Sequence, residues 1–105
     1  MPASNHQEPF REWNLSQYIA AGHAKSSAAY TNIKRICEEY LPGSYSLQLV
    51  DVTQEPEAAV SGQILALPTL IRKEPKPERR IIGDLADLDT VLVSLGVQRP
   101  SAAAV

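Results

Sequence analysis

Segments with the two-residue period of β-strands alternate along this chain with segments of helical period, and this alternation restricts the possible folds more than any other feature. Strands are predicted at residues 14–20, 45–52, 69–73 and 79–82. Helices are predicted from Ser26 or Ser27 to residue 41, over 55–65, and from Gly83-Asp84 to residue 95. The order strand–helix–strand–helix–strand–strand–helix predicts an α/β domain with one mixed sheet.

The connections predict the direction of each strand. A strand–helix–strand start gives a parallel pair with a right-handed crossover. The segment Glu74-Pro75-Lys76-Pro77 is too short for a crossover, so the last two strands are predicted to be antiparallel. The strand at 45–52 is apolar enough to be predicted as largely buried. This arrangement resembles the thioredoxin-like fold, in which helices cover both faces of a mixed sheet.

The size and charge of the chain indicate one domain without an electrostatic preference for polyanions. Of the 105 residues, we expect 13–96 to form the domain, with a flexible arm at 1–12 and a flexible tail at 97–105. A net charge of −2 gives no reason to expect nucleic acid or a membrane surface as partner. No apolar run approaches the ~20 residues that span a bilayer. The lone cysteine favours a reducing, cytoplasmic location.

The residues that would support enzymatic chemistry are missing. In thioredoxin-like enzymes the loop after the first strand carries a cysteine at a helix N-terminus, where the helix dipole lowers its pKa. Here that loop is Gly22–Ser27 and contains no cysteine, whereas Cys37 lies on the apolar stripe of the predicted helix. His6 and His23 have no metal-ligand spacing to other side chains. We therefore expect no enzymatic activity, cofactor or metal.

Several polar residues have two possible roles. Ser26 and Ser27 are explained better as helix caps than as an anion site, and Asp84 is likewise expected to cap the last helix. His23 is either a solvated side chain or a protein contact. Asp51 either accepts hydrogen bonds from neighbouring backbone amides or meets a partner. Pro68 lies directly before the third predicted strand. The resemblance to thioredoxin-like folds, which have a cis proline at this place, implies that Pro68 follows a cis peptide bond.

Two stretches carry a resemblance to a known family. Residues 64–70 and 79–85, with the sequences Ile-Leu-Ala-Leu-Pro-Thr-Leu and Arg-Arg-Ile-Ile-Gly-Asp-Leu, are similar to KaiB, the small protein of the bacterial KaiABC clock. Tyr18–Gly22, Val50–Val52 and Pro56 match in the same order. The resemblance covers roughly residues 14–95.

The resemblance implies a non-enzymatic regulator. It would bind a KaiC-type ATPase and modulate its phosphorylation and ATPase cycle, with KaiA-like or SasA-like proteins as further partners. Position in the fold selects five candidate contacts: Tyr18, His23, Lys25, Gln48 and Asp51. The family also implies a metamorphic chain, in which a homo-oligomeric ground state (a tetramer or a dimer) converts slowly to the thioredoxin-like monomer. Pro68, Pro75 and Pro77 lie at the positions of the prolines implicated in that switch.

Departures from the family pattern leave the pathway open. Lys76 replaces the middle one of three linker prolines, and Gln48 stands where a lysine is common. The host pathway is therefore circadian timing or a related timing or stress response. An alternative is a stand-alone sensor domain like that of SasA, a permanent monomer that competes for the same KaiC surface. A third hypothesis is an enzyme with residual glutathione-dependent or hydrolytic activity. Only the retained Pro68 supports it.

Overall fold

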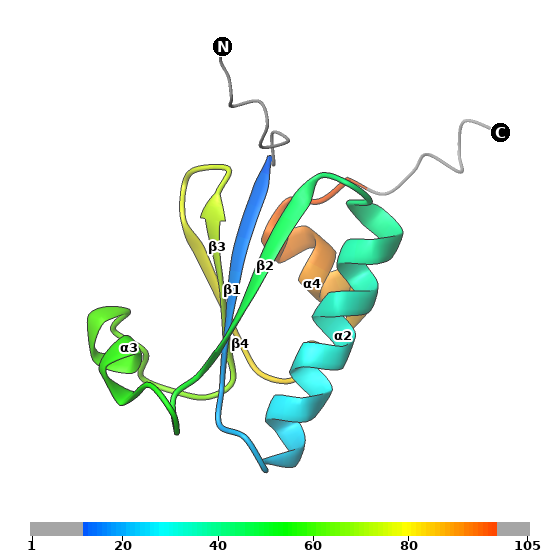
Figure 1. Cartoon of the computed structure of the whole chain (residues 1–105). Coiled ribbons are helices and arrows are strands. Elements are labelled where there is room, and N and C mark those ends of the chain that lie inside the picture. Colours follow the sequence, from blue (N-terminus) through cyan, green and yellow to red (C-terminus); the bar gives the residue numbers. More distant parts are fainter. Residues whose placement is uncertain (1–11, 99–105) are drawn as a thin grey trace, which may run out of the picture.

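Within residues 12–98, the part of the chain that the computed structural model describes, the secondary structure follows the predicted order (Figure 1). The elements are β1 (Trp13–Ile19), α2 (Ala24–Tyr40), β2 (Tyr45–Asp51), α3 (Pro56–Ser61), β3 (Thr69–Glu74), β4 (Arg79–Ile82) and α4 (Leu88–Leu95). No helix in this range is long and apolar enough to cross a membrane. Residues 1–11 and 99–105, most of the expected arm and tail, lie outside the described residues, as does His6.

The strands form one sheet in the order β2-β1-β3-β4. Strands β1 and β2 are parallel, and β1 with β3 and β3 with β4 are antiparallel, which confirms the predicted directions. The prediction that residues 45–52 form a largely buried strand is wrong. Strand β2 lies at a sheet edge, where Val50 is buried but Leu49 keeps 43% of its surface exposed. An edge strand has a neighbour on one side only, so an apolar sequence there does not guarantee burial.

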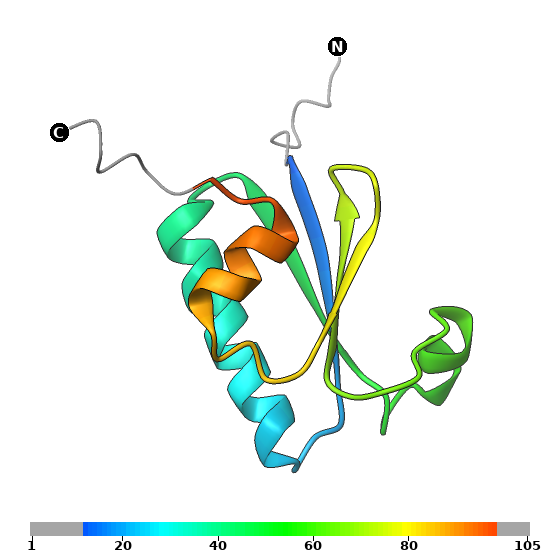
Figure 2. The same ribbon diagram turned by 180° about the vertical axis from the view of Figure 1, so that it is seen from behind.

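Two helices cover one face of the sheet, a third lies beside the other face, and each face has its own apolar cluster. Helices α2 and α4 lie on one face and α3 lies beside the other (Figures 1 and 2). Strand β1 contributes Leu15 to the larger cluster and Tyr18 to the smaller one, as its two-residue alternation predicts. The larger cluster also includes Ala29, Ile33, Ile36, Cys37, Leu41, Leu70, Leu85, Val91, Leu92, Leu95 and Val97. The smaller cluster is completed by Val50 and Ile71, with Val52, Ala58 and Ile64 packed against it.

Helix boundaries differ from the predicted ones. Helix α2 begins at Ala24 after His23, which makes no side-chain cap, so neither Ser26 nor Ser27 is the N-cap. The predicted helix over 55–65 is only α3, which ends at Ser61 and contains no buried residue.

The start of α4 is shifted toward the C-terminus. Its N-cap is Asp87, whose carboxylate accepts a hydrogen bond from the Thr90 amide at 3.3 Å. Asp84 does not cap this helix, because its carboxylate accepts from the Ala86 amide at 3.1 Å. Between the two aspartates, Leu85 has a φ of 62° and is buried in the larger cluster. The chain therefore turns here, and the helix begins only after the turn.

Candidate protein-binding site at the start of helix α2

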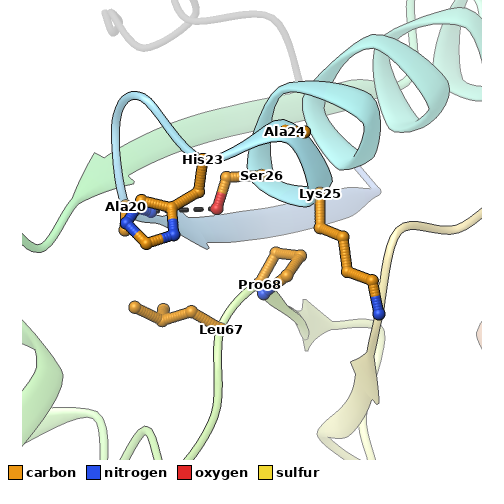
Figure 3. Close-up of a pocket in the computed structure, with 7 residues that line it drawn as sticks. All are labelled: Ala20, His23, Ala24, Lys25, Ser26, Leu67 and Pro68. Atoms are coloured by element: carbon orange, nitrogen blue, oxygen red, sulfur yellow. Dashed lines mark hydrogen bonds between the residues drawn. The ribbon is translucent and has the colours of Figure 1, made fainter.

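A cavity of about 440 Å³ lies between the start of α2 and the segment that leads into β3 (Figure 3). After β1 ends at Ile19, the chain turns at Gly22, which has a φ of 90°, and enters the helix at Ala24. The opposite wall is Leu67 and Pro68, joined by a cis peptide bond as expected from the sequence. The cavity is lined by Ala20, His23, Ala24, Lys25, Ser26, Leu67 and Pro68.

The cavity combines an electropositive rim with an apolar wall. His23 and Lys25 are exposed at the N-terminus of a 17-residue helix, where the helix dipole adds partial positive charge. Ser26 is buried, and its hydroxyl accepts a hydrogen bond from the Ala20 amide at 3.0 Å, which ties the helix to the end of β1. Leu67 keeps 39% of its surface exposed. This geometry suits an apolar group that carries a carboxylate.

The cavity contains no sulfur nucleophile. Cys37 is buried in the larger cluster, and burial, with a smaller contribution from Glu38, raises its pKa to about 12. At neutral pH the thiol is therefore protonated and inaccessible, which confirms that Cys37 belongs to the core. Among residues 12–98 no group of three or more His, Cys, Asp or Glu residues is arranged to hold a metal ion.

Asp51 organises the loop beside the cavity. Its carboxylate oxygen Oδ1 accepts hydrogen bonds from the Ala21 amide at 3.2 Å, the Thr53 amide at 3.0 Å and the Thr53 hydroxyl at 2.8 Å. Hydrogen bonds from Thr53, followed by that from Ala21, lower the pKa of Asp51. The first of the two roles considered for Asp51, bonding to neighbouring amides, is confirmed. It joins the end of β2 to the turn that presents His23.

The other candidate residues are distributed over the sheet. Tyr18 is only 6% exposed and packs in the smaller cluster, so it offers little surface to a partner in this arrangement. Gln48 is exposed on β2, three residues before Asp51. Pro75 and Pro77 lie in the turn between β3 and β4, at the opposite end of β3 from Pro68. The structure therefore gathers His23, Lys25, Asp51 and Pro68 at one end of the sheet. Tyr18 lies at this same end, paired with Val50 and Thr69, but is buried, whereas Pro75 and Pro77 lie at the other end.

Arg80 is a positioning residue that the sequence did not indicate. Its guanidinium donates to the Gln63 carbonyl at 2.9 Å and to the Gly62 carbonyl at 2.7 Å. These bonds hold the segment after α3, which continues to Leu67, against β4. Because both acceptors are main-chain carbonyls, no complementary side chain marks this contact in the sequence.

Comparison with known proteins identifies the family. The sequence model of the KaiB domain matches residues 17–97, which include the whole cavity. Circadian clock protein KaiB3 of Synechocystis sp. is 39% identical over 83 residues, which cover 79% of this chain and 81% of that protein. The chain is a member of the KaiB family. The KaiB resemblance noted in the sequence is thereby confirmed.

Further relatives agree with this assignment. The circadian clock oscillator protein KaiB of Synechococcus elongatus is 40% identical over 87 residues, covering 83% of this KaiB-family chain and 85% of that protein. The N-terminal domain of Synechococcus elongatus SasA superposes with a TM-score of 0.65 at 18% identity, covering 95% of this chain and 94% of that domain. Fasciola hepatica thioredoxin superposes with a TM-score of 0.67 at 19% identity, covering 86% of this chain and 84% of that thioredoxin. The two structural matches confirm the thioredoxin-like fold, and the sequence matches supply the family.

Proposed function

We propose that this KaiB-family protein is a non-enzymatic regulator that binds a KaiC-type ATPase and modulates its phosphorylation and ATPase cycle. The observation that carries the proposal is the cavity at the start of α2. In a KaiB-family chain it keeps the Leu67–Pro68 wall opposite the helix start but presents His23 and Lys25 in place of a nucleophile. The curated relatives are named as circadian clock proteins, which supports circadian timing or a related timing pathway.

The docking surface we propose is the loop from Gly22 to Lys25, the adjoining part of α2 and strand β2. The apolar wall at Leu67 would accept an apolar side chain of the partner, while His23 and Lys25 would meet a carboxylate. Asp51 would act indirectly, because its carboxylate is already bonded to the loop amides. Gln48, exposed on the edge strand β2, would contact the partner at the margin of this surface.

The test is co-migration with a KaiC-type ATPase from the same genome on gel filtration, with ATP hydrolysis followed in parallel. Lys25→Glu should weaken the complex by at least about tenfold, since it reverses the charge on the rim. The matched control is Lys76→Glu in the β3–β4 turn, where Lys76 is exposed and its ammonium lies 3.6 Å from Glu74. This control should leave binding within about twofold. Failure to form any complex with such ATPases would overturn the proposal.

The alternative, a stand-alone SasA-like sensor domain, predicts a different behaviour of the free protein. A KaiB-type regulator should form a homo-oligomer, a dimer or a tetramer, and should show slow exchange between two folds in NMR spectra. A SasA-like domain should remain a monomer with one set of resonances at every concentration. Sedimentation velocity together with NMR exchange spectroscopy separates the two.

A further inference from the structure

The β1–α2 turn, residues 20–23, is not held in place by the packing of its own side chains. Ala21, Gly22 and His23 are exposed, and His23 forms no side-chain cap at the start of α2. Gly22 has a φ of 90°, and a Cβ atom at this position would meet nothing within 4 Å in the described part of the chain. Glycine also loses more conformational freedom on folding than other residues. The order of this turn must therefore come from hydrogen bonds to its main chain.

Ser26 supplies one of these hydrogen bonds from within α2. Its side chain is only 2% exposed, and its hydroxyl accepts from the Ala20 amide at 3.0 Å. With His23 as the N-cap, Ser26 is the third residue of the helix, the position from which the side chain of a capping box reaches back to the N-cap amide. Here the hydroxyl reaches further back, to the first residue of the turn. The Ala20 carbonyl accepts from the His23 amide at 3.2 Å, which closes the turn.

Asp51 supplies another hydrogen bond from the end of β2. Its Oδ1 accepts from the Ala21 amide at 3.2 Å, and the same oxygen accepts from the amide and the hydroxyl of Thr53 at 3.0 and 2.8 Å. Thr53 therefore fixes the carboxylate that holds the turn. The amides of two consecutive residues, Ala20 and Ala21, are thus bonded to side chains from two different elements, α2 and β2.

The two bonds act on one small piece of backbone. The Ala21 amide belongs to the same peptide group as the Ala20 carbonyl, so rotation of that group breaks the bond to Asp51 and the bond from His23 together. Ser26 fixes the amide on the other side of the Ala20 Cα atom. Loss of either side chain therefore frees a rotation that also disturbs the bond to the other side chain.

We propose that Ser26 and Asp51 act as one unit that fixes the β1–α2 turn before a partner arrives, so that both are positioning residues of the docking surface. The inference rests on the proposed function, because the turn leads into His23 and Lys25 at the rim of the cavity. Neither side chain has to touch the partner. Ser26 is buried, and Oδ1 of Asp51 already accepts three hydrogen bonds.

A positioning role changes the association rate more than the dissociation rate. A partner that binds only the ordered turn finds fewer competent molecules when the turn is loosened, and its apparent affinity falls by that fraction. The contacts in the complex, once it has formed, are unchanged. Charge reversal at Lys25 acts differently, because a rim charge steers association and its effect weakens as salt rises.

The first arm of the experiment measures amide hydrogen exchange at Ala20 and Ala21 in the free protein by NMR. Ser26→Ala should speed exchange at both amides by at least about fivefold, and Asp51→Ala should do the same. Asp51→Asn keeps an oxygen acceptor without the charge and should stay within about twofold of the wild type. Ser27→Ala is the matched control, because Ser27 is the next residue of α2 and is exposed. It should change neither rate by more than about twofold.

The second arm measures association and dissociation rates with a KaiC-type ATPase from the same genome at low and high salt. The double variant Ser26→Ala/Asp51→Ala, which lacks both bonds, should associate at least about fivefold more slowly at both salt concentrations. Its dissociation rate should change by less than about twofold. The defect of Lys25→Glu should shrink at high salt. Asp51→Asn should bind like the wild type, which a residue that acts on the partner through its charge would not do.

The proposal is overturned if each single substitution speeds only the amide that it had bonded, because the two side chains would then act separately. It is also overturned if Asp51→Asn is as impaired as Asp51→Ala, or if the double variant dissociates faster by as much as it associates more slowly. If Ser26→Ala does not fold, exchange at Ala20 in Asp51→Ala decides the same question. A wild type that binds no such ATPase overturns the proposed function instead, and the exchange arm still decides whether the turn is held as one unit.

Discussion

Gln17 offers a sharp test of how the buried polar atoms of the central strand affect stability. Its side chain is completely buried in β1. Its Nε2 donates to the Tyr18 carbonyl at 3.4 Å, close to the limit for a hydrogen bond, and its Oε1 has no partner. Gln17→Met replaces this amide with an apolar chain of similar length. We expect the variant to be more stable than the wild type.

The magnitude follows from two opposing contributions. Relief of a buried, unpaired carbonyl oxygen is worth about 1–3 kcal/mol, and loss of the weak bond to Tyr18 costs about 0.5–1 kcal/mol. The net gain is therefore about 0–2.5 kcal/mol, with a midpoint of about 1 kcal/mol, and each kcal/mol corresponds to roughly 4–8 °C in Tm for a domain of this size.

The assay is urea unfolding followed by the fluorescence of Trp13, the single tryptophan of the chain, together with thermal unfolding by circular dichroism. Gln48→Met, at an exposed position of β2, is the matched control and should change the free energy of unfolding by less than about 0.5 kcal/mol. A loss of stability in Gln17→Met with no change in Gln48→Met would refute the reasoning, because it would mean that the buried amide is fully satisfied.

Three further predictions concern titration and capping. The pKa of Cys37 is raised from 9.0 to about 12, so the folded state retains a proton that the unfolded state loses, and stability should fall as pH rises between these values. Comparison of wild type with Cys37→Ala by urea unfolding at several pH values isolates this loss; equal pH dependence in both would contradict the assignment. The pKa of Asp51 is lowered, so its contribution is present above its ordinary value of 3.8 and is lost as pH falls through the folded-state pKa. Asp51→Ala should lower Tm at neutral pH and should reduce the difference in Tm between neutral and acidic pH. If the variant loses as much Tm on acidification as the wild type does, this prediction is contradicted. Asp87→Ala should lower the free energy of unfolding by about 0.5–2 kcal/mol, because the N-cap of α4 is lost, and Asp84→Ala should lower it by less. If denaturant unfolding gives the reverse order, Asp84 rather than Asp87 is the N-cap.

The order of the secondary-structure elements could be predicted because each element depends on residues close in sequence. The apolar stripe of the first predicted helix follows the helical period and consists of Ile33, Ile36, Cys37, Tyr40 and Leu41. All of these are buried except Tyr40, which is half-buried. The start of α4 could not be predicted in the same way. Asp84 and Asp87 are both suitable caps, and the turn at Leu85, which is buried in the core, decides between them.

The degree of burial of each strand depended on its place in the sheet. Residues 45–52 are as apolar as an interior strand, yet β2 is at an edge. Ser16 and Gln17 are polar, yet both are buried because β1 lies between β2 and β3. Alternation along a strand shows which residues share a face, but the neighbours of the strand determine whether that face meets solvent.

The sequence alone determined that this protein has no cysteine where a thioredoxin-like enzyme needs one, because no fold can supply a side chain that the chain does not contain. It also determined the order of strands and helices, since hydrophobic period is a local property. Only the tertiary structure decided that Lys25 and Leu67 line the same cavity and that Arg72 joins Leu95 to Pro77. These contacts link residues far apart in the chain, and main-chain carbonyls accept hydrogen bonds whatever side chain they carry, so local sequence does not record them.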